Sequence, residues 1–326
     1  MMQTDQVDQA ERSGMYAMSA YGGEGWRPRQ GSMAEELGGH WAQCGITTEW
    51  ASLRTVLLHR PGAELAASAD FNAVNMLEPL DLARAQAQHD AMAAAYQAAG
   101  VRVIYAEPST TPTPNQMFMA DVFAMTPEGA IVARPASEVR AGEERVAARR
   151  LADIGVPIIR SISGRATFEG ADLIWLDAKT AVLGRGLRTN DAGVRQITSV
   201  LQEMGCETIV VDLPIGTMHL MGIFRIIDRD LAIAWPYRLA HRAIDALRER
   251  GYQVVLLPEN HETRFQSAFN IVTLGPRRIL MAAGNPITQA FYERLGITCH
   301  TTPVDELGKA AGAIGCLTGI IERERV

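Results

Sequence analysis

The sequence lacks the paired cysteines and clustered histidines that hold structural metals. Its four cysteines, Cys44, Cys206, Cys299 and Cys316, lie far apart and form no CxxC motif, and no HxxxH motif is present. This spacing argues against a zinc ribbon or a disulfide framework and is typical of a reducing compartment. We therefore expect a cytoplasmic protein that needs no metal and no cofactor.

Basic clusters and long apolar runs are also missing. Lys and Arg number 31 against 37 Asp and Glu, a net charge of −6, so nucleic acid is not an expected partner. No uninterrupted apolar run approaches the ~20 residues that span a membrane, and the polar start MMQTDQVDQAERSG is unlike a signal peptide. Residues 1–46, rich in Gly, Ser, Gln and Met, are expected to form a loosely structured N-terminal extension before a single catalytic domain over residues 47–326.

What the sequence does contain is a fivefold pattern. Five short apolar runs begin at Thr55, Ala130, Thr180, Leu231 and Arg278. Each is followed by a stretch with helical periodicity that ends in glycine, and then by a second apolar run. A further apolar segment opens each later unit: MFMADVFAM, FEGADLIWL, MHLMGIFRII, SAFNIVTL and GAIGCLTGII. The unit is therefore strand, strand, helix, strand, repeating about every 50 residues.

Five such units in one chain indicate a closed ring. We predict an α/β fold, a fivefold pseudosymmetric ββαβ propeller around a central cavity, with the helices outside. A doubly wound sheet would instead alternate single strands with helices. No glycine-rich dinucleotide fingerprint follows the first strand, which also disfavours that architecture.

Polar residues interrupt the strand that opens each later unit. They are spaced by 48, 50, 51 and 46 residues, close to the repeat length, and comprise Asp121, Glu169 with Asp172, His219, Asn270 and Cys316. Equivalent positions in a ring point at the same axis, so these side chains are predicted to converge. Taken singly, each has a structural explanation, such as a turn or a buried imidazole. Their shared period is what indicates a functional site.

A thiol, an imidazole and carboxylates at one point favour nucleophilic chemistry. A neighbouring imidazolium lowers the pKa of a thiol, and the same histidine can protonate a leaving group and later deprotonate water. Carboxylates suit a substrate that carries N–H groups or positive charge, such as an amidine or guanidine. Attack by Cys316 on that carbon would expel an amine and leave a planar thiouronium for water to hydrolyse. A Cys/His/Asp metal site is the rival interpretation, which the local spacing does not support.

The segments FEGAD, MHLM, GAIGCLTG, LRTVLLHRPGAEL and RTND resemble the guanidino-group-modifying enzymes. This superfamily contains arginine deiminase, dimethylarginine dimethylaminohydrolase and the amidinotransferases, which share the pentein fold. The resemblance covers roughly residues 49–324 and implies that Cys316 is the nucleophile and His219 the general acid and base. It further implies that Glu169 orients the histidine or binds a substrate nitrogen, and that Asp121 binds the guanidinium-like group.

The same resemblance extends to the rest of the pocket. Arg188 and, less closely, Arg140 match arginines that hold a substrate carboxylate. The sequence departs from arginine deiminases and amidinotransferases at Met221, which replaces their guanidinium-binding aspartate. Dimethylarginine hydrolases also lack that aspartate. We predict that Met221, Asn270 and Asp172 complete the substrate pocket.

Several functions remain open from the sequence. The first is a cysteine-dependent hydrolase of an amidine- or guanidine-type carbon, most like dimethylarginine dimethylaminohydrolase or arginine deiminase. A neutral nitrogen heterocycle such as 2-nitroimidazole, releasing nitrite, would also suit a pocket lined by Met221. The further alternatives are an amidinotransferase and a ligand-binding propeller without activity. The expected partner is a small nitrogen-rich substrate, and exposed strand edges would support a homo-oligomer.

Overall fold

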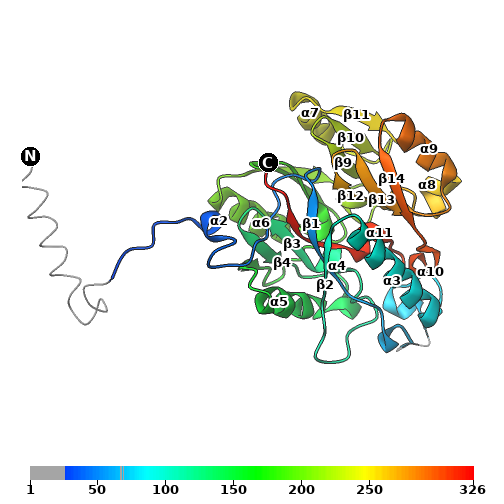
Figure 1. Cartoon of the computed structure of the whole chain (residues 1–326), viewed down its shortest axis with the longest axis horizontal. Coiled ribbons are helices and arrows are strands. Elements are labelled where there is room, and N and C mark those ends of the chain that lie inside the picture. Colours follow the sequence, from blue (N-terminus) through cyan, green and yellow to red (C-terminus); the bar gives the residue numbers. More distant parts are fainter. Residues whose placement is uncertain (1–25, 67, 69) are drawn as a thin grey trace, which may run out of the picture. The chain divides into compact units, whose positions relative to one another are not determined.

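A computed structural model describes residues 26–66, 68 and 70–326 of the chain (Figure 1). The chain divides into two units, residues 1–36, which include α2 (Met33–Glu36), and residues 37–326. Part of the predicted N-terminal extension, residues 1–25, lies outside the described residues. The structure places the boundary ten residues earlier than we expected, because Leu37, Cys44 and Ile46 are buried in the core of the larger unit.

The larger unit is built from five three-stranded sheets. In each sheet the middle strand is antiparallel to one neighbour and parallel to the other, which it reaches through a helix. Four of the sheets, each with its helix, are continuous in sequence. The first two units are β3 (Phe123–Thr126), β4 (Gly129–Val132), α5 (Glu143–Asp153) and β5 (Ile158–Ser161), followed by β6 (Leu173–Asp177), β7 (Thr180–Arg185), α6 (Asp191–Glu203) and β8 (Glu207–Asp212). The next two units are β9 (Phe224–Asp228), β10 (Leu231–Ala234), α7 (His241–Glu249) and β11 (Gln253–Leu256), followed by β12 (Val272–Gly275), β13 (Arg278–Ala282), α9 (Pro286–Arg294) and β14 (Thr298–Thr302). The predicted ββαβ unit is confirmed.

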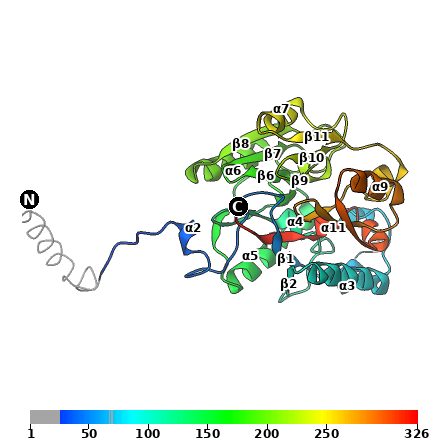
Figure 2. The same ribbon diagram turned by 45° about the horizontal axis from the view of Figure 1, so that its top comes forward.

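The fifth sheet joins the two ends of the ring. It combines β1 (Leu53–Leu58), α3 (Leu82–Ala98) and β2 (Arg102–Tyr105) with β15 (Gly319–Arg323), which pairs antiparallel to β1. In Figure 2 the helices α3, α5, α6, α7 and α9 follow one another in chain order around the unit, and α9 brings the circle back to α3. The ring that the repeat predicted is therefore closed by the last strand.

Local sequence explains where these helices stop. The residue two positions after each of the five long helices is a glycine with φ between +73° and +82°, a left-handed conformation that glycine adopts without strain. These glycines are Gly100, Gly155, Gly205, Gly251 and Gly296. The helix starts are capped less regularly, with Asp81 accepting from the Arg84 amide and Asn190 from the Gly193 amide.

The strands read as continuous apolar runs because helices cover one face and neighbouring sheets the other. Every residue of β3, β4, β10 and β12 is buried. Among the described residues, no helix combines the length and the apolar character that crossing a bilayer requires. A polar side chain at the start of such a strand is therefore exceptional, and these positions build the site.

Candidate active site

Short helical turns precede the first strands of the sheets and carry the predicted site residues. Asp121 lies in α4 (Met119–Val122) and Cys316 in α11 (Ile314–Leu317). Glu169 and His219 stand immediately before the turns η5 (Gly170–Asp172) and η6 (Leu220–Gly222). Asn270 precedes β12 in the same way. The fold thus brings the equivalent positions of the repeat to the middle of the ring.

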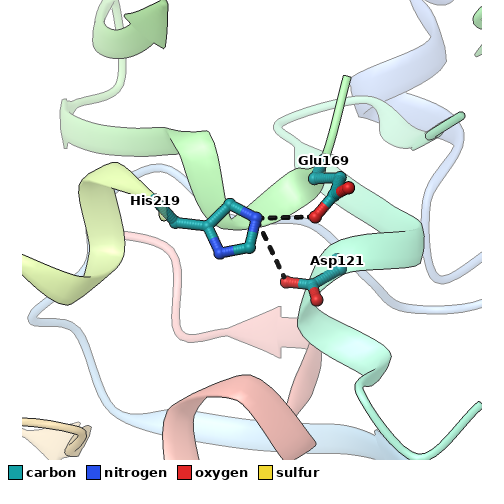
Figure 3. A group of neighbouring side chains, drawn as sticks. All are labelled: Asp121, Glu169 and His219. Carbon is teal, nitrogen blue, oxygen red and sulfur yellow. Dashed lines mark hydrogen bonds and ion pairs between the residues drawn. The ribbon is translucent and has the colours of Figure 1, made fainter. Parts of the chain in front are cut away.

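The imidazole of His219 faces two carboxylates (Figure 3). Its Nε2 lies 2.6 Å from Glu169 Oε2 and 3.9 Å from Asp121 Oδ1. All three residues are buried. Burial opposes a charge on the ring, but the Asp121 charge, the Glu169 hydrogen bond and the Asp172 charge outweigh it and raise the pKa of His219 to about 9. His219 is therefore an imidazolium at neutral pH.

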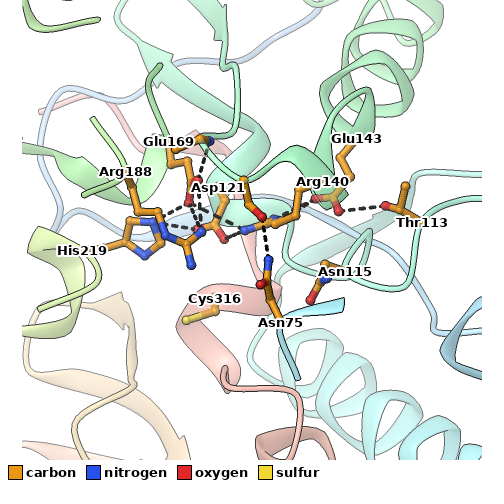
Figure 4. A network of polar contacts seen from close by, with 12 residues as sticks. Asn75, Thr113, Asn115, Asp121, Arg140, Glu143, Glu169, Arg188, His219 and Cys316 are labelled. Carbon is orange, nitrogen blue, oxygen red and sulfur yellow. Dashed lines mark hydrogen bonds and ion pairs between the residues drawn. The ribbon is translucent and has the colours of Figure 1, made fainter. Parts of the chain in front are cut away.

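Arginines neutralise the same carboxylates (Figure 4). Arg140 is buried; it donates from Nη1 to Asp121 Oδ2 at 2.8 Å and from Nε to Glu143 Oε2 at 2.9 Å. Arg188 donates from Nη1 to both Glu169 oxygens, at 3.1 and 3.2 Å. Burial alone would raise the pKa of Glu169, but the His219 hydrogen bond and the cationic neighbours lower it. Glu169 is thus held ionised.

Cys316 lies across from this row of charges on α11. Asn270 Nδ2 lies 3.1 Å from its Sγ, and Asn270 Oδ1 accepts the Gly315 amide at 2.7 Å, so one amide side chain fixes both residues. Burial and the Asp121 charge raise the pKa of the Cys316 thiol, against the lowering effect of its hydrogen bonds to Asn270 and Ala313. The resting site therefore pairs a neutral thiol with an imidazolium.

Two pockets adjoin Cys316, and both are lined by Met218, His219, Ala311 and Cys316. The Asp121 pocket adds Asn75, Asn115, Phe118, Asp121, Arg140, Arg188 and Ala310. The Arg225 pocket adds Gly216, Thr217, Met221, Gly222, Ile223, Arg225, Arg238 and Asn270. The predicted residues Met221 and Asn270 thus lie together in the second pocket, away from Asp121.

Asp172 occupies a different place from the one we predicted for it. Both of its oxygens are bonded within the protein, Oδ2 to the Thr189 hydroxyl at 2.6 Å and Oδ1 to the Leu220 amide at 2.9 Å. It lines neither pocket. Burial raises its pKa to about 6. Asp172 anchors the turn that carries His219 and has no oxygen left for a substrate.

Arg140 also differs from its predicted role. Its guanidinium is bonded to Asp121 and Glu143, and the Thr113 hydroxyl donates to Glu143 Oε1 at 2.7 Å. A substrate carboxylate would have to displace these partners from a buried position. Arg188 keeps Nε and Nη2 outside its contact with Glu169, so it is the better placed of the two arginines for a substrate carboxylate.

Sequence reasoning missed Arg225. It lies in β9, within the apolar run GIFRII, and its guanidinium reaches the pocket that contains Cys316. The available signal was the arginine itself, because a lone cation inside a buried strand is rare.

The Asp121, Glu169 and His219 ligand atoms lie within 4.8 Å of one another, a spacing that a metal ion would also fit. The two arginines already contact the same carboxylates, at 2.8 Å for Arg140 on Asp121 and 3.1 Å for Arg188 on Glu169. A divalent cation there would meet two guanidinium groups at contact distance, which disfavours binding. The cluster fits a carboxylate–imidazolium site better than a metal site.

Comparison with known proteins finds similarity to one enzyme family. A family model described as "N,N dimethylarginine dimethylhydrolase, eukaryotic" matches residues 67–317. The N(G),N(G)-dimethylarginine dimethylaminohydrolase of Streptomyces coelicolor is 25% identical over 81% of this chain and 96% of its own length. The enzyme of the same name from Pseudomonas aeruginosa is 25% identical over 73% of this chain and 89% of its own length.

Solved structures share the fold at lower identity. A mutant of the P. aeruginosa dimethylarginine dimethylaminohydrolase, complexed with citrulline, has a TM-score of 0.70 at 22% identity and covers 84% of this chain and 100% of its own. A saxitoxin-pathway amidinotransferase from Microseira wollei has a TM-score of 0.71 at 14% identity, covering 87% and 98%. The fivefold propeller predicted from the repeat, which the family resemblance identified as the pentein fold, is confirmed.

Proposed function

The chain belongs to the N,N dimethylarginine dimethylhydrolase family, and on that premise we propose that it hydrolyses a C–N bond at a guanidine- or amidine-type carbon through a covalent bond to Cys316. One observation carries the proposal. The thiol of Cys316 and the imidazolium of His219 line the same two pockets, with Asp121 on one side. The family membership makes the chain an enzyme of guanidino chemistry; the residue roles below are our inference.

Asp121 supplies the acceptor for a substrate nitrogen. Its Oδ2 is bonded to Arg140, but its buried Oδ1 has no hydrogen-bond partner among the described residues. A buried carboxylate oxygen without a donor is costly, and a substrate N–H in the Asp121 pocket would satisfy it. We infer that the reacting carbon lies between Asp121 and Cys316.

Substrate binding also changes the charge at the thiol. At rest, burial keeps Cys316 neutral while His219 is protonated. A cationic guanidinium next to the sulfur favours the thiolate, because an opposite charge at contact lowers the pKa of a group. The thiol proton leaves to solvent, and the thiolate attacks the carbon to give a tetrahedral adduct.

His219 then moves the remaining protons. With Nε2 held by Glu169, Nδ1 donates a proton to the leaving nitrogen, the C–N bond breaks, and an amine departs. The neutral imidazole takes a proton from water, whose oxygen attacks the planar S-linked intermediate. Collapse of this second adduct breaks the C–S bond, its hydroxyl proton passes to the departing sulfur, and the neutral urea-type product leaves with Cys316 restored as a thiol.

A product panel tests the proposal. Wild type and Cys316→Ala are incubated with N,N-dimethylarginine, arginine and agmatine, and citrulline-type products, methylamines and ammonia are measured. We expect an amine from at least one substrate and none from Cys316→Ala, while Cys206→Ala behaves as wild type. Turnover that survives in Cys316→Ala would refute the covalent mechanism, and transfer to an added amine would indicate an amidinotransferase.

A second candidate is hydrolysis of a neutral nitrogen heterocycle. The observation that favours it is the Arg225 pocket, where Met221 presents an apolar side chain and none of the described lining residues carries a carboxylate. Such a pocket does not select for a second cationic nitrogen. Nitrite release from 2-nitroimidazole tests this candidate, and its absence would remove it.

A further inference from the structure

Arg225 is an unpaired guanidinium beside the nucleophile. Its side chain makes no hydrogen bond or ion pair with any residue that the structure describes, and its Nε and Nη2 are buried without a partner. Arg225 as a whole is half-buried, but arginine nitrogens that are shielded from water are normally hydrogen-bonded, because an unmatched charge there is costly. The residue therefore lacks the anion that its position calls for.

A glycine next to the nucleophile leaves room for the guanidinium of Arg225. A Cβ on Gly315 would lie 2.5 Å from Arg225 Nη2 and 2.8 Å from Asn270 Oδ1. The absence of a side chain at residue 315 thus makes room for the guanidinium against the turn that carries Cys316. Arg225 reaches this point from β9, so a cation is delivered to the nucleophile from a neighbouring sheet.

The charges around Arg225 leave it positive. Burial lowers its pKa to about 10, with the charges of Cys316 and Glu49 acting in the opposite direction, so it stays protonated at neutral pH. Glu49 lines an adjoining cavity together with Arg225 and Arg323, and its Oε1 accepts the Trp175 amide at 3.1 Å. On the Cys316 side a second cation, Arg238, lines the pocket, and its guanidinium lies 4.6 Å from the centre of the Trp235 ring.

We propose that Arg225 makes its pocket a subsite for a small anion, and that a leaving group which is itself such an anion, unlike the amine of a guanidine, departs there. The inference rests on the proposed nucleophilic role of Cys316. In the step, the thiolate forms the C–S bond while the bond from carbon to the leaving group breaks, and the leaving group takes the electron pair. The Arg225 N–H groups receive the resulting anion, so no proton from His219 is needed. The ligand class is a monovalent anion whose conjugate acid is fully ionised at neutral pH, such as a small oxyanion or halide.

Alkylation by two reagents of nearly equal size tests the subsite directly. Iodoacetate carries a negative charge and iodoacetamide does not, and the labelling rate of Cys316 by each is followed by peptide mass spectrometry. In wild type we expect the ratio of the iodoacetate rate to the iodoacetamide rate to be about tenfold higher at Cys316 than for a free thiol, because the opposite charge in a partly buried pocket attracts the anionic reagent. Arg225→Gln should remove this preference, whereas Arg229→Gln, an equal substitution outside the pocket, should keep it.

The reagent ratio separates binding from thiol ionisation. If Arg225→Gln leaves the ratio of the two labelling rates unchanged, the subsite is refuted. If both rates also fall by the same factor, Arg225 acts only on the ionisation of the thiol. Should Arg225→Gln fail to fold, wild type supplies the second measurement, protection of Cys316 from iodoacetamide by sodium nitrite or thiocyanate at constant ionic strength. Protection supports the subsite and its absence overturns it. Neither measurement depends on turnover of any guanidine, so the subsite can stand where the proposed hydrolysis fails.

Discussion

The two pockets that adjoin Cys316 differ in the kind of polar atom that lacks a hydrogen-bond partner. In the Asp121 pocket every charged group has a partner. The acceptor Oδ1 of Asp121 lacks a hydrogen bond, whereas Arg140 Nη2, which also lacks one, lies 2.8 Å from Glu143 Oε2 in an ion pair. In the Arg225 pocket the unmet atoms are donors, Nε and Nη2 of Arg225. One side of the nucleophile therefore suits an N–H group and the other an electron-rich group. A carbon placed between them is polarised along the bond that must break.

The Asp121 side should depend most on Glu169. Glu169→Gln removes the charge that holds both His219 and Arg188 and leaves the imidazolium without its closest partner. General acid–base catalysis contributes about 10²–10⁴-fold, so we expect kcat/KM to fall by ~10³. Steady-state kinetics on the best substrate of the panel measures this loss. Glu249→Gln, on an exposed face of α7, is the control and should change little; retention of most activity in Glu169→Gln would contradict the assignment.

The Arg225 side should be most sensitive at Gly315. In Gly315→Ala the new methyl meets Arg225, Asn270 and, at 3.2 Å, the backbone oxygen of Ile271. We expect kcat to fall by about 10–100-fold and stability to fall by about 1–3 kcal/mol, since an overpacked core must shift. Denaturation and kinetics measure the two effects. Gly308→Ala, where a Cβ meets nothing within 4 Å, should be close to neutral; an equal loss there would show that position 315 is not special.

The charge of His219 predicts how pH separates the two sides. Its pKa is raised from 6.5 to about 9 in the folded protein, so the stabilisation it provides is complete below pH 6.5 and is lost as the pH rises through 9. Unfolding free energy should therefore decline between about pH 6.5 and 9, and Glu169→Gln should shift this decline to lower pH. Amine release, which needs the imidazolium, should fall only as the pH passes about 9, where the ring deprotonates in the folded protein. Alkylation of Cys316 should instead rise; a fall in both would place the titration elsewhere.

The repeat is the part of this molecule that sequence predicts best. Strand, helix and glycine recur because each unit buries its apolar face against its neighbours in the same way. The polar residue before the first strand recurs with them. The equivalence of Asp121 and Cys316 was therefore visible without coordinates. The hydrogen-bond partners of a side chain, in contrast, depend on which neighbours the fold brings next to it. The repeat period therefore could not reveal that the Arg140 guanidinium is hydrogen-bonded to Asp121 and Glu143.

Asp172 and Arg225 show the same limit of sequence-based prediction: Asp172 was predicted to line the substrate pocket and does not, whereas Arg225 was not predicted there and does. Asp172 looked like a second site carboxylate, but Thr189 and Leu220 use both its oxygens. Arg225 looked like part of an apolar strand, but its guanidinium ends beside Gly315. The N-terminal boundary was misplaced for a related reason, since residues 37–46 have the composition of a linker and gain their order from the core onto which they pack.

The substitution with the smallest expected effect tests the contrast between the two pockets most directly. Met221→Asp places a carboxylate in the Arg225 pocket, where it would pair with the unpaired guanidinium and reverse the local preference. We expect the iodoacetate preference of Cys316 to disappear and KM for a cationic guanidine to fall by about two- to fivefold, the range of a partly exposed charge pair. Met221→Asn, equal in shape but neutral, should keep the iodoacetate preference. If Asp and Asn behave alike, the pocket responds to polarity and the charge of Arg225 does not govern what binds beside Cys316. If only Asp acts, the sign of the charge on each side of the nucleophile decides which substrate the family fold accepts here.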